Sequence, residues 1–111
     1  CPLRDEQLDQ LPHGLRELQL IRCTQLTNEA LERVLRLKDL CRLSVAGCMF
    51  TSAGLEVLKS MQLTHLDLSR CILIDWSHCQ WLFSLKRLQS LNLSHAEGLR
   101  PHYLHQLIEN N

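Results

Sequence analysis

The sequence predicts an α/β fold in which short strand-plus-helix units follow one another along the chain. Three observations lead to this prediction. The spacing LxxLxLxxC, with one Ala in place of Cys, recurs four times. Apolar residues three and four positions apart follow each copy. In most units a residue suited to begin a helix stands between the strand pattern and these apolar residues. Alternating Leu predicts a short strand, and the wider spacing predicts a helix.

The strand halves of the four units share one pattern. They begin at Leu15, Leu40, Leu63 and Leu88, which are 25, 23 and 25 residues apart. The other members of the pattern are Leu18, Leu20 and Cys23; Leu43, Val45 and Cys48; Leu66, Leu68 and Cys71; and Leu91, Leu93 and Ala96. We expect Leu18, Leu43, Leu66 and Leu91 to point inward and to lie side by side in the interior.

The helical halves align in the same register. Thr27, Thr51 and Asp75 stand where a helix needs a side-chain oxygen as its N-cap. The fourth unit has Arg100 there, followed by Pro101, which suits the first helical position. Two apolar columns follow, one of Leu31, Leu55, Cys79 and Leu104 and one of Val34, Leu58, Leu82 and Leu107.

These alignments divide the chain into one domain of about four and a half units. The four full units span residues 15–39, 40–62, 63–87 and 88–111, and residues 1–14 match the second half of a unit. A single unit cannot bury its apolar face alone, so stacked neighbours must share one core. Because the sequence opens in mid-unit at Cys1, we expect it to be a piece of a longer protein.

Composition narrows the function classes. The formal net charge is zero, with 12 basic and 12 acidic residues, which does not favour binding to nucleic acid or to a membrane surface. No apolar run is long enough to span a bilayer. We expect no cofactor and no small-molecule substrate.

Six cysteines leave two interpretations, a disulfide framework or small buried side chains. Cys23, Cys48 and Cys71 recur once per unit, and Cys79 occupies a helical core column. We therefore predict that these four are reduced and buried, which indicates a reducing compartment, cytoplasmic or nuclear. Cys1 and Cys41, which lie off these columns, are expected to be partly exposed.

Neither metal binding nor catalysis is predicted. The best metal candidates are His78 and Cys79 with Cys71, and His102 with His105, but no paired CxxC ligands occur. The neighbours Ser77–His78 and Ser94–His95 lie on short loops and do not place a base against a nucleophile.

The pattern LxxLxLxx(N/C)xL, repeated in register from Leu15 onward, resembles the leucine-rich repeat. Cys at the asparagine position and repeats near 25 residues resemble its cysteine-containing subtype, which is familiar from F-box substrate receptors of ubiquitin ligases. This resemblance implies a right-handed solenoid with short parallel strands on the concave face and helices on the convex face. It also implies binding to another protein.

The candidate binding surface follows from strand geometry, because residues between the inward leucines point to the other side of the sheet. It comprises Glu17, Gln19, Arg22, Arg42, Ser44, His65, Asp67, Arg70, Asn92 and His95. The alternative is that this face is merely solvated. Trp76 and Trp81, together with Ile72 and Leu73, stand where other units carry mostly polar residues. They are expected either to form a second contact site on the outside or to fold over and pack beside Cys79.

The sequence thus favours a non-catalytic protein-binding module, an intracellular adaptor or substrate-recognition domain of the ubiquitin conjugation pathway. The alternative is a scaffold, inhibitor or assembly factor resembling the ribonuclease inhibitor, although that family has longer repeats. A third reading, a secreted receptor ectodomain, would need cysteine-rich caps and disulfides, and the sequence indicates neither.

Overall fold

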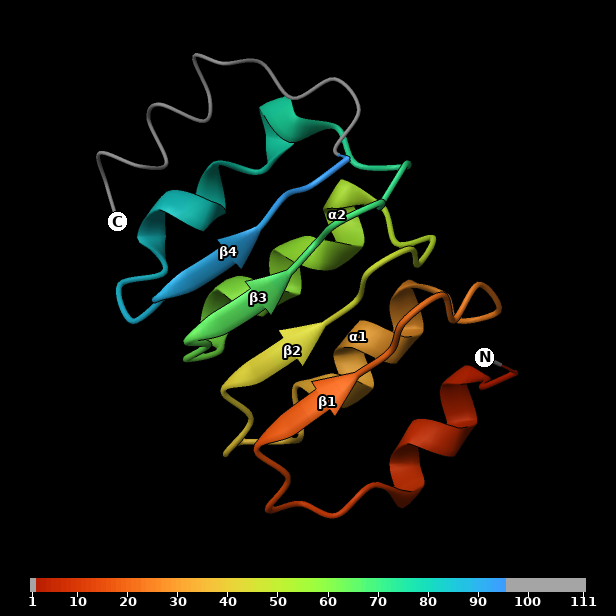
Figure 1. Ribbon diagram of the computed structural model, residues 1–111. Helices are drawn as coiled ribbons and strands as arrows, with labels where there is room; N and C mark the ends of the chain where they lie inside the picture. The colour runs from red at the N-terminus through yellow and green to blue at the C-terminus, as the bar shows by residue number, and fades with distance from the viewer. Residues whose placement is uncertain (1, 96–111) are drawn as a thin grey trace.

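A computed structural model of the chain describes residues 2–95, and the predictions for Cys1 and for residues 96–111 lie outside them. The described part is an α/β fold around a four-stranded parallel sheet with the order β1-β2-β3-β4. The strands are β1 (Glu17–Gln19), β2 (Arg42–Ser44), β3 (His65–Asp67) and β4 (Ser90–Asn92). Figure 1 shows the helical segments behind the sheet, so the other sheet face is left open.

The predicted helical halves are present but are shorter than α-helices of ordinary length. They are η1 (Asp5–Gln10), α1 (Asn28–Val34), α2 (Ser52–Leu55), η2 (Glu56–Ser60), η3 (Trp76–His78) and η4 (Gln80–Ser84), where η marks a 3₁₀ helix. In the third unit the buried residues Cys79, Leu82 and Leu85 are three apart. A 3₁₀ helix has three residues per turn, so this spacing keeps all three on the buried side.

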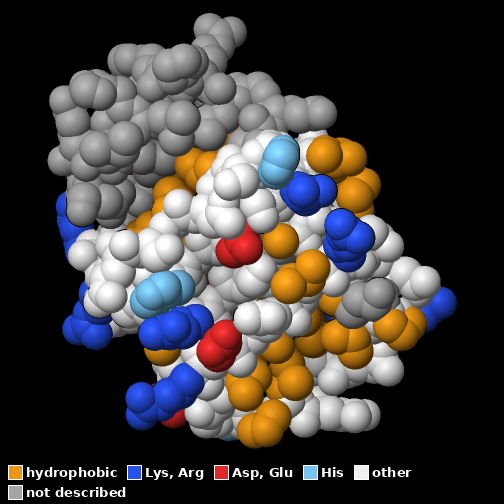
Figure 2. All heavy atoms as spheres, viewed as in Figure 1, with side chains coloured by type: hydrophobic (Ala, Val, Ile, Leu, Met, Phe, Trp, Pro, Cys, Tyr) orange, Lys and Arg blue, Asp and Glu red, His pale blue; other side chains and the backbone are white. Residues whose placement is uncertain are grey.

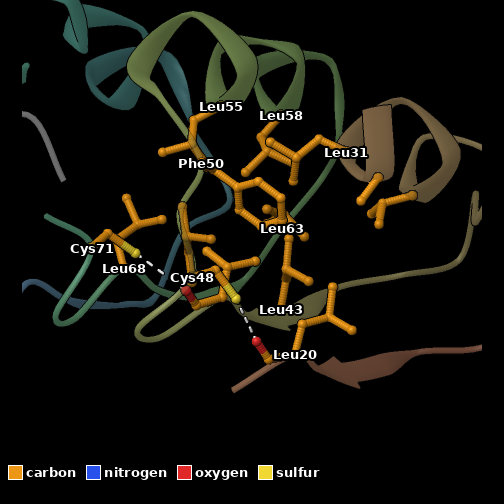
Figure 3. Packing of buried hydrophobic residues seen from close by; sticks show 14 of the residues in the cluster. Leu20, Leu31, Leu43, Cys48, Phe50, Leu55, Leu58, Leu63, Leu68 and Cys71 are labelled. Carbon is orange, nitrogen blue, oxygen red and sulfur yellow. Dashed lines mark hydrogen bonds between the residues drawn. The ribbon is translucent and has the colours of Figure 1, made fainter. Parts of the chain in front are cut away.

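The predicted register of the inward leucines is confirmed. Leu18 pairs with Leu43, Leu43 with Leu66, and Leu66 with Leu91. The first three are buried, whereas Leu91, on the edge strand β4, is half-buried. Phe50 is fully buried among them, and Figure 3 shows its ring between Leu43 on the strand side and the leucines of the helical segments.

The predicted N-caps are confirmed for the three units that the structure describes. The side chain of Thr27 accepts a hydrogen bond from the backbone N–H of Glu29, that of Thr51 from Gly54, and that of Asp75 from Ser77. Each cap satisfies a backbone donor that the first helical turn leaves open.

Two of these caps are also bonded to the preceding unit. The buried carboxylate of Asp5 accepts from the Thr27 N–H at 2.8 Å and from the Thr27 hydroxyl at 2.5 Å. Asn28 donates to the Thr51 hydroxyl at 2.8 Å and accepts from the Thr51 N–H at 3.2 Å. These contacts fix the distance between neighbouring helical segments, so the units stack in one geometry.

We predict that Leu66→Ala lowers the free energy of unfolding by roughly 2–5 kcal/mol, because it leaves a cavity in the centre of the leucine column. Urea denaturation followed by circular dichroism measures the change. The matched control is Ser90→Ala on the exposed side of β4, which should shift stability by less than about 0.5 kcal/mol. A similarly small effect of Leu66→Ala would contradict its place in the core.

Candidate functional site

The open face of the sheet carries two columns of polar side chains, one on each side of the buried leucines. These residues, defined here as the open face, are Glu17, Arg42, His65 and Ser90 in the first column and Gln19, Ser44, Asp67 and Asn92 in the second. They line a hollow of about 260 Å³. The structure brings all eight side chains together on one surface. Figure 2 shows that this surface carries both basic and acidic side chains.

The second column is partly used by the protein itself. Asp67 accepts from the N–H of Ser69 at 2.9 Å, and Asn92 accepts from that of Ser94 at 2.9 Å. Ser44 makes a longer contact of the same kind, at 3.5 Å, and donates to the Asp67 carboxylate at 3.3 Å. These side chains hold the backbone where it leaves the strand, a structural role that the sequence analysis did not assign to them.

The side chains of the first column make fewer bonds with the protein's own backbone. Arg42 is exposed and forms no ion pair with any described residue, although it lies between Glu17 and His65 in the sheet. His65 shares a hydrogen bond of 2.9 Å with the hydroxyl of Thr64. Glu17 accepts from the Gln19 amide at 3.1 Å. This column therefore offers a partner both a cation and an anion.

Arg22, Arg70 and His95 lie at the corners where the chain leaves β1, β3 and β4. Their φ angles are 56°, 58° and 60°, in the left-handed region that non-glycine residues rarely adopt. The equivalent corner after β2 is Gly47, with φ 72°. The alignment of Gly47 with two arginines and a histidine is the signal in the sequence that could have predicted this corner.

The tryptophans do not form an outside contact site. Trp76 and Trp81 are only 4% and 7% exposed and belong to the core. The prediction of a second contact on the outside is wrong, and their burial agrees with the packing alternative. Trp76 aligns with Asn28 of the first unit, and its segment η3 contacts α2 and η4. Ile72 and Leu73 are exposed as expected.

The cysteine column bonds one unit to the unit before it. The thiol of Cys48 donates to the carbonyl of Leu20 at 2.6 Å, and that of Cys71 donates to Val45 at 3.2 Å. Figure 3 shows both bonds running toward the preceding strand exit. A small buried thiol is thus the side chain that can satisfy this carbonyl without opening the core.

The prediction that all four in-column cysteines are reduced is wrong for Cys23, which is disulfide-bonded. The other described cysteines, Cys41, Cys48, Cys71 and Cys79, are free. Cys41 is half-buried, as expected.

Burial sets the acidity of the free thiols. It raises the pKa of both Cys71 and Cys79 to about 11, and it raises the pKa of Cys48 as well. A thiol with a raised pKa holds little thiolate near neutral pH, so these side chains are poor nucleophiles and poor metal ligands.

The side chains of Ser77 and His78 are not arranged as a nucleophile and its general base. The Ser77 hydroxyl donates to Asp75 at 2.6 Å, and the His78 ring lies 3.6 Å from the same carboxylate. The bonds from Ser77 lower the pKa of the Asp75 carboxyl, which serves as a helix cap. No group of three His, Cys, Asp or Glu residues that could hold a metal ion occurs within residues 2–95.

Comparison with known proteins found no match among family models and none among curated protein sequences. In the part of the chain that the structure describes, none of the helices is both long and apolar enough to cross a membrane.

We predict that Gly47→Ala lowers the free energy of unfolding by about 1 kcal/mol or more. The new methyl group would sit in the left-handed region and 3.1 Å from Cγ of Arg22. Urea denaturation measures the effect. Gly14→Ala is the control, because its methyl group would meet nothing within 4 Å and its φ is not positive. Equal effects of the two substitutions would contradict the corner geometry.

We predict that Cys41 reacts first with a thiol reagent at neutral pH, because Cys48, Cys71 and Cys79 are buried and hold their protons. Peptide mapping by mass spectrometry after timed labelling gives the order. In strong denaturant all four should react at similar rates. Rapid labelling of native Cys71 would contradict its place in the core.

Proposed function

We propose that the chain is a leucine-rich-repeat solenoid whose function is to bind another protein, without chemistry of its own. The observation that carries this proposal is the unbroken register of β1 to β4, in which each leucine of the column is flanked by outward polar residues. A rigid sheet with pre-placed polar side chains loses little entropy on binding, which favours recognition of a folded surface.

The site chemistry supports a binding role over catalysis. The candidate catalytic residues Ser77 and His78 both contact the helix-capping carboxylate of Asp75. The open face carries both charge signs, which suits specific pairing with a protein better than uniform attraction to nucleic acid or to a membrane.

The compartment that we propose is the cytoplasm or nucleus, and the class is an adaptor or substrate-recognition domain, with the ubiquitin pathway as the leading context. Four free cysteines among the described residues support a reducing compartment, whereas the disulfide of Cys23 counts against it. The ribonuclease-inhibitor-like scaffold is the alternative, and its partner would be an enzyme held against the same open face.

The proposal predicts site-specific photo-crosslinking. A benzoylphenylalanine placed at Ser90 or Arg42 on the open face should form adducts with a protein from cell extract, and excess unmodified chain should compete them away. The control position is Glu32, exposed on α1. Gel mobility and mass spectrometry identify the adducts.

Adducts that are equally strong from Glu32, or that competitor does not reduce, would contradict the open face as a binding surface. Absence of adducts from both open-face positions and from a third probe at exposed Arg70, where the chain leaves β3, would contradict the proposed function.

A further inference from the structure

The exposed large hydrophobic side chains of the described residues all lie where the chain leaves the strands. They are Ile21 (48% exposed), Met49 (36%), Ile72 (55%) and Leu73 (46%). Single exposed apolar residues are common, but their grouping at one edge of the sheet is unusual. In Figure 2, hydrophobic side chains are visible on the right-hand side of the molecule, toward which the strands of Figure 1 point, and also across its lower centre.

The same edge carries two arginines, and the exposed Asp75 comes directly after its third segment, residues 69–74. The segments 21–26, 46–50 and 69–74 contain Arg22 and Arg70 but no Asp or Glu. Both arginines are exposed, and neither forms an ion pair with any residue that the structure describes. Because these segments hold two arginines and no carboxylate, they carry a local positive charge. We define the exit rim as Ile21, Arg22, Met49, Arg70, Ile72 and Leu73.

The backbone holds the two arginines in place. The N–H of Arg22 donates to Ala46 at 2.8 Å, and that of Arg70 donates to Ser94 at 3.1 Å. Their left-handed φ angles cost about 1 kcal/mol each, a cost that glycine avoids. Gly47 shows that the corner accepts glycine, and its lack of a side chain leaves room for the Arg22 stem. The same corner recurs after each of the four strands, so it places the Arg22 and Arg70 side chains at equivalent positions of their units.

We propose that the exit rim binds an acidic segment of the partner protein that also carries apolar side chains. The carboxylates would pair with Arg22 and Arg70, and the apolar side chains would cover Ile21, Ile72 and Leu73. The arginines are two strands apart, about 10 Å at the backbone, so one extended segment or one helix face reaches both. This inference rests on the proposed protein-binding function. It places the main contact with the partner on the exit rim instead of the open face.

The test uses a fluorescent peptide in which Leu and Glu alternate, titrated with the full chain and followed by anisotropy. Peptides with Gln or Lys in place of Glu are the charge controls. The acidic peptide should bind best, and its affinity should fall between about 50 mM and about 300 mM salt as the ion pairs are screened. Amide chemical shifts from NMR should move in the segments of the exit rim.

Matched variants locate the site. Arg22→Glu with Arg70→Glu should weaken binding about tenfold or more, and Ile72→Ser with Leu73→Ser should weaken it without affecting the salt dependence. Arg42→Glu makes the same charge change on the open face and should leave the affinity within about twofold. Thermal melting verifies that each variant is folded, since all these side chains are exposed.

Several outcomes would overturn the inference. Equal binding of the Gln or Lys peptide, or no saturable binding of the acidic one, would refute an acidic segment. Loss of binding with Arg42→Glu alone would place the site on the open face, and the proposed function would stand. A dimer in sedimentation experiments that Arg70→Glu dissociates would identify a second copy of the chain as the occupant instead.

Discussion

The pairing of one leucine per strand across four parallel strands is the constraint on which the rest of the structure depends. Once Leu18, Leu43, Leu66 and Leu91 share a register, every flanking residue is placed by strand alternation. The open face, the exit corners and the cysteine bonds all follow at fixed offsets from this column. A one-residue slip in any strand would turn its polar residues into the core.

Polar contacts between units supply a geometry that the leucines alone do not. Apolar burial is non-directional, so it stabilises stacking without fixing the distance or angle between neighbours. The bonds from Asp5 to Thr27, from Asn28 to Thr51 and from Cys48 to the preceding strand exit are directional. In the third unit the residue aligned with Asn28 is Trp76, which is buried in the core.

The surface has two regions of different character. The open face is polar, carries both charge signs, and partly serves its own backbone through Asp67 and Asn92. The exit rim is apolar and positive and makes few bonds within the protein. A partner that covered the rim would bury the exposed apolar side chains and pair the free arginines, so the larger gain in binding free energy lies there.

The sequence by itself determined the units, their register, the inward leucines and the helix caps, because these depend on spacing and local bonding within a few residues. It also located the open-face columns, which follow from alternation. Only the tertiary structure decided that Trp76 and Trp81 are buried, that Cys23 is disulfide-bonded and that Arg22 and Arg70 occupy left-handed corners. Those features depend on which side chains of neighbouring units meet, and spacing along one chain does not encode how much room a neighbour leaves.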